Sequence, residues 1–255
     1  MSRLMIVEPR LIAAAAASRG TGADNLRSVN PKEAWVDSAT GGTVTITIDL
    51  GAPVEIDTIM LGYVLGSVAA TSWSITGGLV SADQAVIQAP TVLRVPDVPG
   101  RFAAVSHGLW TGVARTVRYL AIALTHPGPA RLSAGVLVIG KAFSPELGQD
   151  WGGGRQPIDT GIATALPDGG FATVEGVVKS SFACTFSDLS EVETLLLEKI
   201  AEGLGTTRPG LLIEDVTRSA GLIARMHYGV FGKWKSFERR NRAQTRWDIS
   251  IEQWV

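Results

Sequence analysis

The chain has 255 residues, of which 45% are apolar and 18% are charged, and its formal net charge is −1. This length suits two domains, and this composition excludes a globally disordered chain. The charge balance argues against a protein that mainly coats nucleic acid. The single Cys184 excludes an intrachain disulfide and a cysteine-based metal cluster. No run approaches the ~18 apolar residues of a membrane span.

Short strand patterns dominate the first 140 residues. Apolar and polar residues alternate in runs that are separated by breaks rich in Gly, Pro and Ser, such as "HPGPA". Many short strands with turn punctuation indicate an antiparallel sandwich or barrel. The predicted strands are 43–50, 56–64, 72–76, 85–88, 118–124 and 134–139.

The stretch "TVTITIDLG" (43–51) raises the question of what Asp49 does at the end of a strand. A carboxylate there can act as a general base, but carboxylate catalysis usually needs a second acid or a positioned partner. Asp57 and Glu55 lie nearby in sequence, but they alternate with apolar residues and are expected to face solvent. We therefore interpret Asp49 as a residue that caps a turn with its side-chain oxygens.

The segment 142–161 changes in character, since it is rich in Gly and Pro and poor in aliphatic residues. We predict a linker there, between a first domain over 1–141 and a second over 162–255.

The second domain is predicted to be a β-sheet with one packed helix over 189–203. Asp188 or Ser190 can cap this helix, and Gly203 or Gly205 can end it. Strands are predicted near 172–186, 211–216, 222–228 and 247–251. The apolar helix face that should pack on the sheet comprises Val192, Leu195, Leu196 and Ile200.

No catalytic or cofactor motif is present in the sequence. His107, His126 and His227 have no close metal-ligand spacing, and no serine lies in a GxSxG elbow. Cys184 lies within an alternating strand and is interpreted as a core residue. The glycine clusters match neither a phosphate loop nor a dinucleotide fingerprint. We therefore expect no enzyme activity, no metal and no cofactor.

The strongest charge feature is the basic segment 233–246. Two functions remain open for it: contact with nucleic acid, or an interface with a neighbouring subunit. The acidic balance of the rest of the chain favours the interface. The interface residues that we predict are Trp234, Phe237, Arg239, Arg240 and Arg242, and the further basic residues are Lys233, Lys235 and Arg246.

Residues 8–141 resemble the discoidin, or coagulation-factor C-type, branch of galactose-binding-like domains. "NPKEAW", "TVTITIDLGAPVEIDTIML", "ATSWSITGG", "RTVRYLAIAL" and "GVLVIG" carry the resemblance. It implies a jelly-roll sandwich in which Trp35 and Leu50 fill the core, Asp49 ends a strand and Gly51 allows a sharp turn. The bracketing cysteines of secreted members are absent.

The "ADNLRSVNPKEAW" stretch resembles the version of this domain in tail proteins of bacteriophages and prophages. The second domain is similar, more weakly, to tail-tube or distal-tail domains. These resemblances imply a structural protein of a long-tailed phage, at the tail tip or baseplate of the virion and made in the host cytoplasm. Its partners would be other tail proteins, further copies in a ring, and a host glycan.

The alternative is a carbohydrate-binding module of a soluble or exported bacterial protein. For that function, Trp73 and Trp110 are the candidate exposed aromatic residues of the sandwich loops.

Overall fold

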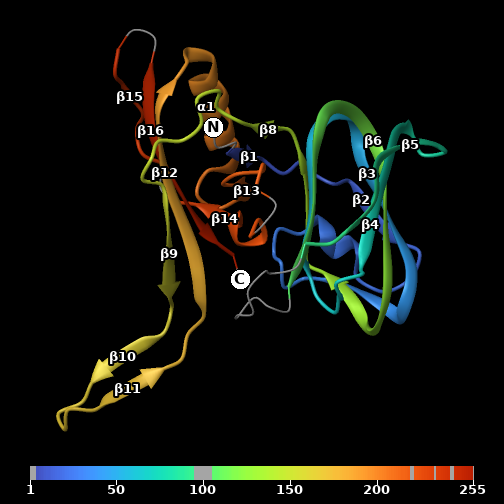
Figure 1. Ribbon diagram of the computed structural model, residues 1–255, viewed down its shortest axis with the longest axis horizontal. Coiled ribbons are helices and arrows are strands. Elements are labelled where there is room, and N and C mark those ends of the chain that lie inside the picture. The colour runs from blue at the N-terminus through green and yellow to red at the C-terminus, as the bar shows by residue number, and fades with distance from the viewer. Residues whose placement is uncertain (1–3, 95–104, 219–220, 233, 242–243, 255) are drawn as a thin grey trace.

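The computed structural model describes residues 4–94, 105–218, 221–232, 234–241 and 244–254 (Figure 1). This part of the chain is mainly β and forms two units that lie side by side. Each unit is built on an antiparallel sheet, so the predicted fold class is confirmed.

The first unit is a six-stranded sheet with the order β2-β3-β6-β4-β5, in which β7 also pairs with β3. The long strands β3 and β6 pair along most of their length, and their register shifts at several points where they bend. Two of the predicted strands, 43–50 and 56–64, are therefore parts of one element. The elements are β2 (Ala14–Ala17), η1 (Ala23–Arg27), β3 (Trp35–Val64), β4 (Ser72–Val80), β5 (Asp83–Val92), β6 (Ser106–Ala134) and β7 (Val136–Gly140).

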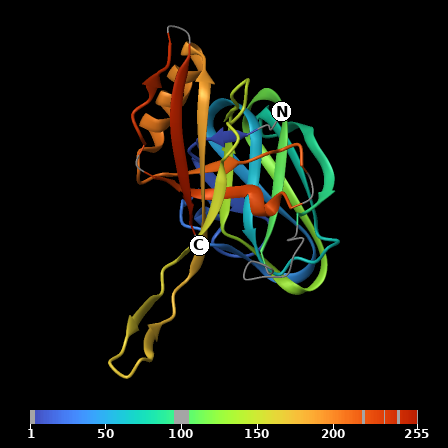
Figure 2. The same cartoon turned by 60° about the vertical axis from the view of Figure 1, so that its left-hand side comes forward.

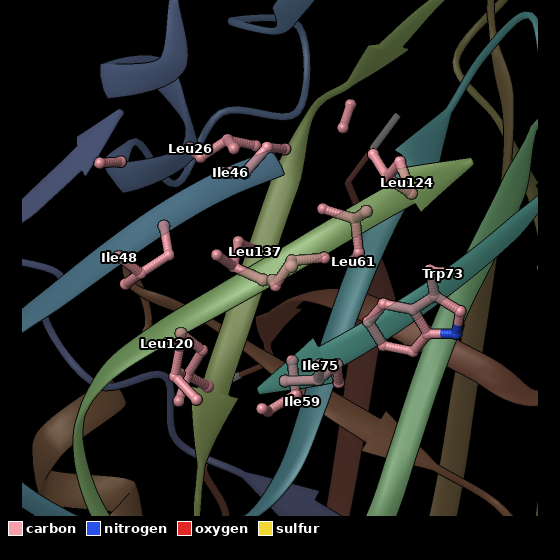
Figure 3. Packing of buried hydrophobic residues seen from close by; sticks show 14 of the residues in the cluster. Leu26, Ile46, Ile48, Ile59, Leu61, Trp73, Ile75, Leu120, Leu124 and Leu137 are labelled. Atoms are coloured by element: carbon pink, nitrogen blue, oxygen red, sulfur yellow. The ribbon is translucent and has the colours of Figure 1, made fainter. Parts of the chain in front are cut away.

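Alternation along these strands builds the core of the first unit. Val44, Ile46 and Ile48 are buried, because every second residue of a strand points to the same face. Trp35 is fully buried, and its Nε1 donates a hydrogen bond to the carbonyl of Arg19 at 3.3 Å. Figure 3 shows how residues from several strands meet in this core, among them Ile46, Ile48, Ile59, Leu61, Trp73, Ile75, Leu120 and Leu124.

Asp49 stabilises a bulge within β3. Its Oδ1 accepts a hydrogen bond from the Gly51 amide at 2.7 Å, and Gly51 has a φ of 80° that favours glycine. The same carboxylate takes a bidentate pair from Arg118 of β6, at 3.0 and 3.2 Å. The hydrogen bond from Arg118, followed by that from Gly51, lowers the pKa of Asp49. The turn role predicted for Asp49 is consistent with this geometry, and Arg118 is a partner that sequence reasoning missed.

We expect Asp49→Asn to cause a small loss of stability at neutral pH and little loss in acid. A carboxyl group whose pKa is lowered on folding stabilises the protein above its unfolded pKa, and that contribution disappears as the pH falls. Urea unfolding at pH 7 and at about pH 3 measures the difference. Asp24→Asn, at an exposed carboxylate, is the control. A loss that is equally large at both pH values would contradict the assigned role.

The second unit is an eight-stranded sheet with the order β8-β1-β13-β14-β16-β12-β9, in which β15 pairs with β16. A separate two-stranded ribbon, β10 paired with β11, connects β9 to β12. The elements are β1 (Met5–Val7), β8 (Ala142–Phe143), β9 (Gly154–Asp159), β10 (Ile162–Ala165), β11 (Phe171–Val174), β12 (Val178–Leu189), α1 (Glu191–Leu204), β13 (Pro209–Ile213), η2 (Ile223–Arg225), β14 (Met226–Phe231), β15 (Glu238–Arg239) and β16 (Thr245–Gln253).

The helix α1 begins with a capping box, in which Ser190 and Glu193 bond each other's backbone amides, and it ends at Gly205. Its packed face differs from the prediction. Leu197, Ile200, Ala201 and Leu204 form the row that packs on the sheet core, because this row continues over two turns. Of the four residues predicted for the packed face, only Ile200 packs on the core. The other three are exposed: Val192, Leu195 and Leu196. No helix in the described ranges is long and apolar enough to cross a membrane.

The sheets divide the chain differently from the predicted domains at two places. β1 lies within the second sheet, between β8 and β13, although residues 1–141 were assigned to the first domain. Residues 154–159 of the predicted linker 142–161 form β9, which pairs with β12. An alternating pattern identifies a strand but not its partner, and the partner of β1 is about 200 residues further along the chain.

The two units share an apolar interface. The Tyr63 hydroxyl donates to the carbonyl of Trp254 at 2.5 Å, and the Tyr228 hydroxyl donates to that of Val29 at 2.8 Å. The two tyrosine rings contact each other edge to face. A cluster of buried residues from both units surrounds them: Val7, Met60, Leu109, Val136, Val138, Leu211, Ile213, Leu222 and Met226.

Candidate functional site

The three histidines are buried at separate places, and each is held by a local partner. His107 Nδ1 accepts from the Tyr63 amide at 3.0 Å, and burial lowers its pKa to about 4. His126 Nδ1 lies 2.9 Å from Thr71 Oγ1, and His227 Nε2 lies 2.7 Å from Glu214 Oε1. The histidines therefore contribute to packing, as the lack of ligand spacing indicates.

Cys184 is buried in β12, and this burial raises the pKa of its thiol to about 12. The thiol is protonated near neutral pH and is a poor nucleophile. Within the described residues, no group of three or more His, Cys, Asp or Glu side chains is placed to hold a metal ion.

The basic segment folds back on its own sheet. Trp234 stacks on Phe231 with ring centroids 4.9 Å apart, and its Nε1 donates to the carbonyl of Gly205 at 2.9 Å. Phe237 packs against Trp247. Both predicted interface aromatics thus contact their own chain, and within the segment β15 pairs with the start of β16 as a hairpin.

The arginines of this hairpin lie near α1. Arg239 belongs to β15, and Arg240 has its guanidinium 3.9 Å from Asp188. Arg246 and Lys235 both approach Asp248, at 3.7 and 3.1 Å. Lys233 and Arg242 lie outside the described residues. The interface role of the segment stays a prediction.

A different segment projects from the molecule. Residues 160–177, which we call the arm, carry the ribbon of β10 and β11 away from both units (Figures 1 and 2). At its base, Thr160 exchanges hydrogen bonds with Val177. At its tip, Gly169 has a φ of 85° and Asp168 accepts from the Gly170 amide at 2.9 Å. These turn residues give the ribbon a defined end.

The arm is apolar on both of its faces. Ile162 pairs across the ribbon with Val174, and Ala165 pairs with Phe171, so the two pairs lie on opposite faces. Ile162, Phe171 and Val174 are 64–70% exposed. The arm contains Asp168 and Glu175 and no Lys or Arg. An isolated two-stranded ribbon is marginally stable in water, so this geometry favours burial of the arm against another surface.

A second unpartnered apolar surface lies on α1. Val192, Leu195 and Leu196, which we call the helix face, are 51–68% exposed. Beside it is a small cavity of about 140 Å³ that Leu195 lines together with Phe237 and Arg239 of the basic hairpin. In Figures 1 and 2, the arm leaves one end of the second sheet, and α1 with β15 lies at the other end.

The predicted boundaries divide the arm between the linker and the second domain, although the sequence contains a signal for it. "IATA" and "FATV" are short runs of strand composition, and "LPDGG" between them is a turn sequence. Together they are typical of a hairpin.

Comparison with known proteins gives matches of fold only. No protein-family model and no curated protein matches the chain. A chitosan-binding module from a Paenibacillus sp. IK-5 chitosanase/glucanase is 16% identical, with a TM-score of 0.42 over 52% of this chain and 98% of the module. The CBM32 of AlyQ, solved with 4,5-unsaturated mannuronic acid, is 20% identical, with a TM-score of 0.38 over 52% of this chain and 97% of that one.

A reduced XRCC1 structure bound to the DNA polymerase β catalytic domain matches at a similar level. It is 11% identical, with a TM-score of 0.41 over 53% of this chain and 98% of the other. The similar structures include carbohydrate-binding modules, and proteins named for other partners match equally well. We therefore assign no ligand from these likenesses, and they give no support to a phage-tail setting.

Proposed function

We propose that this protein is a structural subunit that assembles with copies of itself through the arm, with no catalytic activity. The observation that supports this is the projecting ribbon with Ile162, Phe171 and Val174 exposed. Exposure of apolar side chains to water on an unsupported hairpin is unfavourable in a monomer. Burial of these side chains against another subunit is favourable and stabilises the assembly.

The occupant of the helix face in this proposal is the arm of a second copy. Both surfaces are apolar, and the arm carries only acidic charges. Arg239 lines the cavity beside the helix face, together with Glu191 and Glu198, and Arg240 lies next to it in the chain, 3.9 Å from Asp188 of β12. Opposite charges at the rim of a contact fix its register and orientation. Because arm and helix face lie at opposite ends of the second sheet, one copy can give its arm and receive another. Such a head-to-tail contact can be repeated from each subunit to the next, and a ring forms when the rotation between neighbouring subunits closes the assembly.

Removing the apolar character of the arm should prevent assembly. The triple variant Ile162→Ser, Phe171→Ser and Val174→Ser is expected to be a folded monomer under conditions where the unmodified protein is an oligomer. Sedimentation velocity and native mass spectrometry measure the state, and circular dichroism checks the fold. Val113→Ser is the matched control, since Val113 is 83% exposed on the first unit. An unmodified protein that stays monomeric at high concentration, or a triple variant that still assembles, would refute the proposal.

A charge exchange tests the chosen occupant. Arg239→Glu with Arg240→Glu should weaken assembly, and adding Asp168→Arg with Glu175→Arg should restore it. The second pair of charge reversals restores assembly only when its residues meet the first pair across the contact. Failure of this restoration, with assembly still dependent on the arm, would place the arm on a different surface.

The phage-tail setting is the finer part of the proposal, and its support is the sequence resemblance. In that setting the subunit lies at the tail tip or baseplate of the virion, with other tail proteins as neighbours. Mass spectrometry of purified particles, made from a host that carries this gene, tests it directly. Absence of the protein from particles that contain the other tail components would refute it.

Carbohydrate binding by the first unit is the second candidate, and it is the activity for which two of the similar structures are named. The aromatic residues that the sequence offered for it are not available on the surface, because Trp73 and Trp110 are 1% and 8% exposed. A glycan array probed with the full chain tests this function. Binding that is lost on substitution of exposed residues of the first unit would establish it, whatever the state of assembly.

A further inference from the structure

A cavity of about 720 Å³ opens on the second unit. One wall is the loop that precedes β9, with Gln149 and Trp151. The other wall is the segment after β13, with Glu214 and Arg218, together with Arg225 of η2. Its size lies within the range of about 300–1,000 Å³ that is usual for small-molecule sites.

Trp151 is the distinctive residue of this cavity. All seven tryptophans lie in the described residues, and Trp151 is the one whose side chain is fully exposed. The loop after it consists of glycines, and a side chain at Gly152 would meet nothing within 4 Å. A flat indole on an open loop offers an apolar face to a ligand, together with an N–H donor.

The polar groups of the cavity are already held in position. Glu214 Oε1 lies 2.9 Å from Arg155 Nε and 2.7 Å from His227 Nε2. Asp215 accepts from the Thr217 hydroxyl at 2.6 Å and lies 3.3 Å from Arg218 Nε.

The loop wall carries two further polar side chains. Asp150 accepts from the Ser187 hydroxyl. The buried Oε1 of Gln149, by contrast, has no hydrogen-bond partner. An unpaired buried acceptor is costly. Because this oxygen is covered, it does not itself present an acceptor to a ligand in the cavity.

The charges of the wall define the class of ligand. Three carboxylates, those of Asp150, Glu214 and Asp215, face the guanidinium groups of Arg218 and Arg225, with Arg155 paired behind Glu214. The site therefore has no excess of positive charge for a phosphate or a polyanion. It offers acceptors and donors side by side, which suits neighbouring hydroxyl groups, and an aromatic face, which suits the apolar face of a sugar ring.

We propose that this cavity binds a neutral saccharide, with a sugar ring against the Trp151 indole and its hydroxyls between the carboxylates and the arginines. This site differs from the carbohydrate site considered above for the first unit. It does not depend on assembly through the arm.

The test is calorimetry and saturation-transfer NMR of the full chain with neutral trisaccharides built from glucose, galactose, mannose and N-acetylglucosamine. At least one should bind the unmodified protein. Trp151→Ala should weaken that binding by about tenfold or more, whereas Trp151→Phe, which keeps an aromatic face, should lose less. Phe171→Ala, at an exposed aromatic residue of the arm, is the control and should bind normally.

Three results would overturn the proposal. The first is that none of the saccharides binds. The second is that one binds and Trp151→Ala leaves its affinity unchanged, which places the site elsewhere. The third is that no saccharide binds and Trp151→Ala dissociates an oligomer, which makes Trp151 a protein contact. The monomeric arm variant should bind the same saccharide, so failure of the assembly proposal and failure of this one are distinguishable.

Discussion

Trp35→Ala is expected to lower the free energy of unfolding by about 3–5 kcal/mol, as for a large aromatic removed from a core. Trp35 is fully buried at the start of β3, and its indole N–H is bonded to the carbonyl of Arg19. The substitution removes the ring from the cluster that holds the first unit together, and it leaves that carbonyl without its donor.

Urea unfolding followed by circular dichroism measures this loss. Val36→Ala is the matched control, because Val36 is the next residue of the same strand and is 42% exposed. The control should change stability by less than about 0.5 kcal/mol. A loss below about 1 kcal/mol for Trp35→Ala would contradict its core position, and with it the alignment on which the galactose-binding-like resemblance depends.

Ile6→Ala should cost about 2–5 kcal/mol, although Ile6 lies at the opposite end of the chain from most of the unit that it stabilises. Ile6 is fully buried in β1, where it pairs with Leu212 on one side and with Phe143 on the other. Its side chain belongs to the core of the second unit. The damage should therefore appear in the second unit first.

Hydrogen exchange resolved by mass spectrometry tests this distribution. In Ile6→Ala, amides of β13 and β14 should exchange faster than in the unmodified protein, and amides in the centre of β3 should change less. Ile6→Val, which keeps most of the volume, should cost about 0.5–1.5 kcal/mol. Faster exchange confined to the first unit would mean that β1 belongs with the first 141 residues after all.

The features that the sequence predicts well are those written in local patterns. The alternation of Val44, Ile46 and Ile48 identifies the central strand, and Ser190 with Glu193 identifies the start of α1. Asp49 and Gly51 predict a strand end and a turn; the structure has a bulge there instead, and β3 continues through it.

What the sequence could not predict depends on distant partners. Nothing near Ile6 indicates that it pairs with Leu212, and nothing near Asp49 indicates Arg118. The helix has two apolar rows, and only the position of the sheet decides which of them is covered. The cavity at Trp151 has the same origin, since its two walls come from segments about 60 residues apart.

The place of β1 in the second sheet also sets an order of events during synthesis. Met5 leaves the ribosome before its partner Ile213, which follows about 200 residues later. At roughly 5–20 residues per second, this strand waits about 10–40 s without its neighbours. The first unit is complete by Gly140, and the amide of Arg10 then bonds the carbonyl of Ile139 at 2.8 Å. Folding of the first unit thus brings β1 beside the start of the remaining chain. The loop that must close for β1 to pair with β8 would span more than 100 residues in an unfolded chain, and it becomes short before the second sheet forms.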